Sequence, residues 1–420
     1  MRADFDKRWL LPFGILAISA MVALGIVVLG PSFAGRSFAE VAQQGTNETA
    51  QTSSEAPTTD CSDAPATDDA CYQGHRQEAA SQPTGTREVA AANCSGAQAT
   101  DYVCYQQRYR DLVHDYGVEA AFARLKNELT TDEFARSNCH LLTHFIGRAA
   151  ADLYGDVGIA YSHGSNFCGS GYYHGAMEAI VGKIGPDKIL EKANTLCANL
   201  DGYQKYSFYH YNCAHGLGHG FMDIKDDELF GSLETCDALK DRWERNRCYG
   251  GVFMENVVAK DDPGHSSKYL KADQPLYPCD VVGARYKNEC YQRQTSYALQ
   301  TQGNDFAKVF DLCAKVEDDF RPACYQGLGW DASVQSLKQG TSDAAINGST
   351  RTPCMLGKDY EARFNCAVGA VDYFIRDSYS DTRAKAFCEY FGADLRASCL
   401  QEAEEYYGSL QSPLERRGTS

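Results

Sequence analysis

The sequence predicts an all-α protein made of helical-hairpin repeats, solenoid-like or toroid-like, in which local disulfides join the two helices of each hairpin. Apolar residues recur at three- and four-residue spacing over most of the chain after residue 105, and few stretches alternate as strands do. Cysteines recur as closely spaced pairs, and each second cysteine opens a similar helical segment. Sequential pairing predicts these bridges: Cys236–Cys248, Cys279–Cys290, Cys313–Cys324, Cys354–Cys366 and Cys388–Cys399.

The intervals between the second cysteines alternate between longer and shorter, so the repeating unit should contain two hairpins. Internal periods of this kind are typical of helical repeat proteins. A glycine recurs three residues after the second cysteine, at 171, 216, 251, 327 and 369. Each such glycine costs a helix about 1 kcal/mol. We therefore expect close helix contacts at these positions to offset that cost.

The N-terminus predicts a membrane anchor. Residues 9–31 form an apolar run long enough to span a bilayer. Arg2, Lys7 and Arg8 precede it, so residues 1–8 should remain cytoplasmic and the body should be exported. This gives a single-pass membrane protein bound to the membrane by its N-terminal helix. The alternative is secretion after cleavage near Ala34.

The rest of the chain divides by composition. Residues 32–104 predict a disordered, flexible stalk with two small loops, at Cys61/Cys71 and Cys94/Cys104. Residues 105–225 form a histidine-rich helical region, which should begin with helices at 105–129 and 132–154 and a capping box from Thr130 to Glu133. Residues 226–410 hold the disulfide-stapled repeats, and 411–420 form a disordered tail.

Charge and cysteine usage exclude several functions. The 420-residue chain has a net charge of −16, which argues against nucleic acid as a partner. Its 18 cysteines, an even number, suit an oxidising compartment. No CxxC or zinc-finger spacing occurs, so thioredoxin chemistry, c-type haem attachment and zinc on thiolates have no support. Phosphate-binding and dinucleotide-binding motifs are likewise absent from the sequence.

Histidines are concentrated between residues 140 and 219. Five of the 10 histidines fall in three sets with four-residue spacing: His140/His144, His174/Glu178 and His215/His219/Asp223. Residues four apart share one face of a helix, so three helices can direct these side chains to one point. His174 and His219 each stand six residues after the second cysteine of a pair. The equivalent position in later repeats is Met254, Ser296 or Trp330. A residue needed only for packing would not have to be histidine.

These sets predict a centre for a divalent transition metal such as zinc, copper or iron. The candidate ligands are His140, His144, His163, His174, His215, His219, Glu178 and Asp223. Glu178 is also the candidate general base toward metal-bound water. The alternative is that the histidines only pack and form hydrogen bonds in the core.

The sequence thus predicts an exported metal-binding protein, and leaves open whether it is an enzyme. As an enzyme it would use the histidine-rich centre to activate water or dioxygen. As a metal carrier or sensor it would bind the ion without catalysis. The other alternative is a non-catalytic helical-repeat scaffold that binds a protein, a peptide or a glycan.

Overall fold

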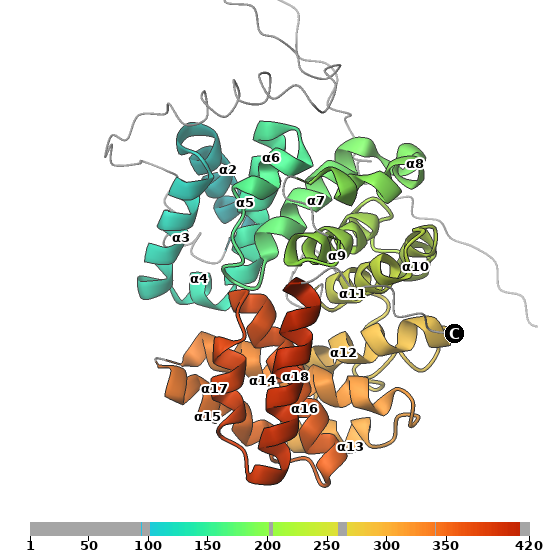
Figure 1. The fold of residues 1–420 in the computed structure, drawn as a ribbon. Helices are drawn as coiled ribbons and strands as arrows, with labels where there is room; N and C mark the ends of the chain where they lie inside the picture. The colour runs from blue at the N-terminus through green and yellow to red at the C-terminus, as the bar shows by residue number, and fades with distance from the viewer. Residues whose placement is uncertain (1–93, 95–100, 201–204, 259–266, 341, 412–420) are drawn as a thin grey trace, which may run out of the picture. The chain divides into compact units, whose positions relative to one another are not determined.

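The computed structural model describes Cys94 and residues 101–200, 205–258, 267–340 and 342–411. Within these ranges the protein is all-helical, with seventeen α-helices, one 3-10 turn at Cys197–Asn199 and no strand, which confirms the predicted class (Figure 1). The predicted anchor at 9–31, nearly all of the predicted stalk, and the tail from 412 lie outside the described residues. In the described part of the chain, no helix is both long and apolar enough to cross a membrane.

The first nine helices are α2 Tyr102–Tyr116, α3 Val118–Thr131, α4 Glu133–Ser137, α5 Cys139–Tyr154, α6 Val157–Ser162, α7 Gly171–Ile184, α8 Pro186–Leu196, α9 Phe208–Asp223 and α10 Leu229–Asp237. They are followed by α11 Arg242–Val258, α12 Ala284–Thr301, α13 Phe306–Cys313, α14 Arg321–Gln339, α15 Asp343–Cys354, α16 Tyr360–Ser378, α17 Thr382–Cys388 and α18 Ala393–Gln411.

The two helices predicted at 105–129 and 132–154 are each divided in the structure. Gly117 separates α2 from α3 with a φ of 84°, a conformation that glycine adopts at little cost. Asn138 separates α4 from α5. The capping box predicted from Thr130 to Glu133 is wrong, because Asp132 caps α4 and its carboxylate accepts a hydrogen bond from the Ala135 amide at 3.1 Å.

All five predicted local disulfides are present. Most of them join a cysteine at or near the C-terminus of one helix to a cysteine in the first half of the next. Three more bridges are present: Cys94–Cys104, Cys139–Cys168 and Cys197–Cys213. No described cysteine is free, whereas Cys61 and Cys71 lie outside the described residues. These eight disulfides indicate an oxidising, extracytoplasmic environment.

The helices that carry or directly follow the second cysteines contact one another in chain order: α7, α9, α11, α12, α14, α16 and α18, with α5 on the N-terminal side of α7. The recurrent glycines lie where their backbones meet. A Cβ atom on Gly251 would lie 2.0 Å from the backbone oxygen of His215, and one on Gly369 would lie 1.8 Å from that of Gln326. A larger residue would force these helices apart, so the expected close contacts are confirmed at both positions.

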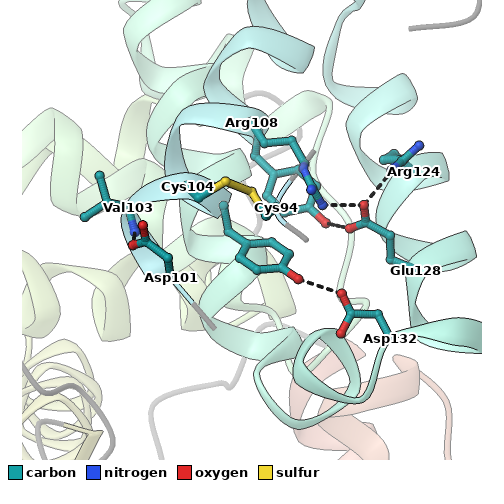
Figure 2. The surroundings of a disulfide bond; sticks show 10 residues. Cys94, Asp101, Val103, Cys104, Arg108, Arg124, Glu128 and Asp132 are labelled. Carbon is teal, nitrogen blue, oxygen red and sulfur yellow. Dashed lines mark hydrogen bonds and ion pairs between the residues drawn. A yellow bond between two sulfur atoms is a disulfide. The ribbon is translucent and has the colours of Figure 1, made fainter. Parts of the chain in front are cut away.

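The N-terminal end of the helical body is fixed by polar contacts around α2. The Cys94–Cys104 disulfide joins Cys94 to this helix, as Figure 2 shows. The buried Arg108 guanidinium lies 2.6 Å from the Glu128 carboxylate on α3. These contacts hold α2 and α3 together, and α2 packs in turn on α5, the first helix of the histidine cluster.

Candidate metal centre

Five of the predicted ligands come together in one cluster. His140 and His144 lie on α5, His174 lies on α7, and His215 and His219 lie on α9. His174 is central, since its ring centroid is 4.6 Å from that of His219, 4.9 Å from that of His215 and 5.3 Å from that of His140. His140 is partly buried and the other four are buried. The four-residue spacing therefore brings the imidazoles to one region, as the sequence predicts.

Glycines allow the three helices to approach closely enough for this. A Cβ atom on Gly175 would lie 2.1 Å from the backbone oxygen of His144, and one on Gly171 would lie 2.4 Å from that of His140. On α9, a Cβ atom on Gly216 would lie 2.8 Å from the Met177 side chain. The glycines thus bring α5, α7 and α9 close enough for their histidine rings to meet.

The cluster contains two triplets that share His174. One consists of His140, His144 and His174, and the other of His174, His215 and His219. In each triplet, the nitrogens that could bind an ion lie within 4.8 Å of one another. Each triplet could therefore hold one metal ion, so the centre could take one or two.

Three of the rings are oriented by a second layer of acceptors. The Nδ1 atom of His140 lies 2.8 Å from the Cys168 carbonyl oxygen, and that of His144 lies 3.0 Å from Glu178 Oε1. The Nδ1 atom of His219 lies 2.6 Å from Glu255 Oε2. Carbonyl and carboxylate oxygens only accept hydrogen bonds, so these contacts favour the tautomer with the proton on Nδ1 in each ring. Such partners are typical of histidines that bind a metal through Nε2.

This protonation pattern leaves two lone pairs face to face on α5. The Nε2 atoms of His140 and His144 are only 3.1 Å apart. If both neutral rings carry their proton on the Nδ1 atom that faces an oxygen, neither ring has a proton on Nε2. Two lone pairs repel at this distance unless a cation lies between or beside them. Two nitrogens bound to one tetrahedral zinc ion are about 3.3 Å apart, since metal–nitrogen bonds are about 2.0–2.1 Å.

The second pair, on α9, is less constrained. The Nε2 atoms of His219 and His215 are 3.3 Å apart. The Nδ1 atoms of His215 and of His174 are buried, and neither has a hydrogen-bond partner in the described residues. His215 can therefore donate from Nε2 to His219, or it can bind an ion there. The geometry of this pair fits a metal site but does not require a cation.

Glu178 is engaged at both of its oxygens. Oε2 lies 2.7 Å from Arg148 Nε, and Oε1 lies 3.0 Å from His144 and 3.6 Å from His219. Burial would raise the pKa of this carboxyl group, but Arg148 and His144 hold the pKa well below its usual value. A carboxylate with so low a pKa is a weak base at neutral pH. The contacts fit an orienting acceptor better than the general base that the sequence suggested.

Two predicted ligands lie outside the triplets. His163 stacks on Tyr154 and places Nδ1 2.8 Å from Glu119. Asp223 is an exposed residue at the C-terminus of α9, and it belongs to none of the possible metal groups in the described residues. The four-residue spacing correctly places Asp223 on the same face of α9 as His219, but Asp223 lies one helical turn further along and so beyond the cluster.

Glu255 on α11 was missed by the sequence argument. It accepts from His219 at 2.6 Å, and it forms a third possible metal group with Glu178 and the same histidine. A separation of 2.6 Å is that of a hydrogen bond and is shorter than the spacing of two ligands on one ion. The only signal in the sequence was that Glu255 directly follows Met254, the residue of its repeat that is equivalent to His174 and His219.

A small cavity adjoins the cluster. It has a volume of about 30 Å³, and His174, His215, Tyr211, Trp330 and Arg376 are among the residues that line it. A water molecule needs about 10–15 Å³, so about two waters, or a group of a few atoms, fit there. A small molecule can therefore lie against two of the candidate ligands.

The metal-free protein should lose stability as the pH falls below about 6.5. Burial, followed by the neighbouring His144, lowers the pKa of His140 to about 3. Burial also places the pKa values of His174 and His215 well below 6.5. Between these values and 6.5 the unfolded chain binds more protons than the folded one, so protons favour unfolding there. Each such histidine then costs about 1.4 kcal/mol per pH unit.

Urea titrations of the chelator-treated protein at several pH values would measure this slope. Asp377 has the opposite effect on stability between pH 6 and 4. Burial raises its pKa to about 6, so the folded protein binds this proton before the unfolded chain does, and falling pH favours folding there. The matched variant is His174→Met, because Met254 occupies the equivalent position on α11. It should show a shallower slope than the wild type, and an equal slope would contradict the assignment.

No protein-family model matches this chain, and neither the curated proteins nor the solved structures that were compared contain a detectable relative. The case for a function therefore depends on the histidine cluster itself.

Proposed function

We propose that this protein is an extracytoplasmic metal-binding protein whose histidine cluster holds a divalent transition metal ion. The observation that carries the proposal is the 3.1 Å separation of the His140 and His144 Nε2 atoms, in two rings whose Nδ1 atoms both face oxygen acceptors. Burial lowers the pKa of His140 to about 3, so this ring stays neutral at pH 7, and a proton shared by the pair would have to make His144 an imidazolium beside Glu178. A metal ion resolves the repulsion without protonation.

The first ion would be held by His140, His144 and His174. Zinc, copper and iron all suit imidazole ligands, and three histidines leave at least one coordination position for a small ligand. Glu178 would orient the ring of His144, and the Cys168 carbonyl that of His140. Glu255 would orient His219, a ligand of the second position. The triplet of His174, His215 and His219 offers a second position, with His174 shared between the two.

We propose further that the centre is catalytic. The cavity of about 30 Å³ beside His174 and His215 supports this, because it gives water or dioxygen a place next to the ligands. A bound metal would supply the Lewis acidity or the redox chemistry, and the metal's identity would decide between hydrolysis and oxidation. The protein's own part is to hold the rings, exclude bulk water and admit a small molecule. A carrier or sensor would use the same ligands without turnover.

A scaffold function is the second candidate, and one observation favours it. A larger cavity of about 510 Å³ is lined by residues of α11, α12, α14, α16 and α18, among them Asn246, Gln292, Gln326 and Glu402. We propose that these stapled hairpins form a helical repeat and that the cavity receives part of a ligand. Retained ligand binding by a metal-free protein would favour this candidate.

Metal analysis of the protein purified without a polyhistidine tag tests the proposal. We expect one or two equivalents of a single transition metal per chain, removable by a chelator and restored by adding that metal. A folded protein that contains no metal, and takes up none from zinc, copper or iron salts, would contradict it. Helix content by circular dichroism distinguishes a missing metal from a missing fold.

We also propose that the body is exported and anchored by residues 9–31, on the strength of the apolar run with Arg2, Lys7 and Arg8 before it. Protease added outside intact cells or spheroplasts should release a soluble fragment by cutting between residues 35 and 100. Mass spectrometry of the fragment locates the cut. A body that is protected until the cells are lysed would refute this topology, and a fragment already free in the medium would indicate cleavage near Ala34.

A further inference from the structure

The larger cavity lies on the same face of the repeats as the histidine cluster. Its volume is about 510 Å³, against about 30 Å³ for the cavity beside His174. In three successive repeats the residue two positions after the second cysteine lines the large cavity: Gln292, Gln326 and Val368. The equivalent residues of the early repeats, Ser170 and His215, line the small cavity. Equivalent positions along the repeats therefore face both cavities.

Arg376 on α16 borders both cavities. Its Nε atom donates a hydrogen bond at 2.6 Å to the hydroxyl of Tyr406, which lines the large cavity. Its Nη1 atom donates to the hydroxyl of Tyr211, which lines the small one. The large cavity is thus next to the candidate metal centre, although the walls of the two cavities differ in chemistry.

The wall of the large cavity is hydrophilic. Its aliphatic side chains are limited to Pro322, Ala323, Val368 and Val371. Pockets that bind apolar molecules have mostly hydrophobic and aromatic walls. Carboxamides take that place here, and those of Asn246, Asn288 and Gln292 form no hydrogen bond with another described residue. A carboxamide both donates and accepts hydrogen bonds, so the wall offers unused donors and acceptors side by side.

The charges in this wall argue against an anionic ligand. Each of its arginines is already paired with a carboxylate: Arg247 with Glu289 at 3.0 Å, Arg376 with Asp372 at 2.7 Å, and Arg285 with Asp237 at 2.7 Å. Two further carboxyl groups of the wall, those of Asp319 and Glu402, form no ion pair with a described residue. The wall therefore has an excess of negative charge, and every arginine in it already has a carboxylate partner.

A peptide segment suits this wall poorly. The described residues contain no strand, so no sheet edge among them can pair with an extended peptide. An amphipathic helix needs an apolar groove and a proline-rich segment needs an aromatic one, but Tyr406 is the only aromatic residue in the described wall. Hydroxyl groups suit it better, because each hydroxyl both donates and accepts, as a carboxamide does.

We propose that the large cavity binds a neutral saccharide. Asn246 on α11 and Asn288 and Gln292 on α12 bind its hydroxyl groups. The volume lies within the range of about 300–1,000 Å³ that is typical of small-molecule pockets. The inference rests on the ligand-binding scaffold proposed above as the second function, and it does not require the metal centre.

Calorimetric titration with neutral trisaccharides tests the proposal. The full-length protein is treated with a chelator and kept in a detergent without a sugar head group, so that neither metal nor detergent interferes. The probes are maltotriose, cellotriose and tri-N-acetylchitotriose, with trigalacturonate as the anionic counterpart. We expect at least one neutral probe to bind, and trigalacturonate to bind at least about tenfold more weakly, because its carboxylates would face the acidic wall. Anionic binding as tight as neutral binding would contradict the proposal.

Gln292→Leu should weaken saccharide binding at least about fivefold, because the hydroxyls of the ligand lose a partner. The matched control is Gln300→Leu, which changes the same residue type at an exposed position of α12 that lines neither cavity. It should leave the affinity unchanged. If Gln292→Leu does not fold, Asn288→Ala takes its place and should also weaken binding. Failure of every neutral probe to bind, or equal binding by the wild type and the cavity variants, would overturn the proposal.

Two cationic probes, spermidine and the peptide trilysine, separate the possible failures. If either binds in a way that Gln292→Leu weakens, and no saccharide does, the scaffold function holds and the saccharide assignment is wrong. If no probe of either kind binds, both are wrong. His140→Ala separates the cavity from the metal centre, since it should lose metal and keep saccharide binding.

Discussion

Replacing His144 by alanine should remove the metal from the first triplet. The change deletes one Nε2 ligand and leaves His140 without its facing partner at 3.1 Å. Loss of an orienting partner alone typically costs 10–100-fold in affinity, and loss of a ligand should cost more. Equilibrium dialysis against the native metal, with elemental analysis of the retained protein, measures the effect. Glu178→Gln should weaken metal binding by about 10–100-fold, because it keeps the shape of the side chain but removes the charge that orients His144.

Two variants make this result specific. His174→Met substitutes the residue that occupies the same slot in α11, so helix content should be nearly unchanged while metal binding is lost. His163→Ala is the matched control, because His163 pairs with Glu119 away from the cluster, and it should retain the full metal content. A His144→Ala protein that binds metal as the wild type does would refute the site, even if the protein contains metal elsewhere.

Reduction of the disulfides should unfold the helical body. Most of the bridges close short loops and each contributes about 2–4 kcal/mol, while a whole domain is stable by only about 5–15 kcal/mol. The eight described bridges together exceed that margin. Circular dichroism with and without reductant should therefore show loss of most helical signal. A reduced protein that keeps its helix content and melting temperature would contradict this expectation.

One pair of double variants links the disulfides to the site. Removing Cys139–Cys168 should weaken metal binding, because the Cys168 carbonyl accepts from His140 Nδ1 at 2.8 Å. Removing Cys388–Cys399 should cost comparable stability but leave metal affinity unchanged, since this bridge joins α17 to α18. Similar metal affinity in both variants would show that the loop does not position His140.

The sequence by itself determined the helical class, the five local disulfides and the clustering of His140, His144, His174, His215 and His219. These features are local. Cysteines on either side of a hairpin turn lie close together regardless of the rest of the fold, and four-residue spacing puts two imidazoles on one helix face. The helix boundaries at Gly117 and Asn138 were missed because apolar periodicity continues across each break.

The tertiary structure alone decided which polar groups surround the histidines. Glu255 reaches His219 from α11, His163 turns to Glu119, and the Cys168 carbonyl fixes His140. The hydrogen bond from Arg376 to the Tyr211 hydroxyl is equally invisible in the sequence. Each of these contacts joins different helices, or a helix and a loop, and depends on how close those segments lie and how each helix is rotated about its axis. Packing sets both quantities, and the glycine contacts between backbones are part of that packing.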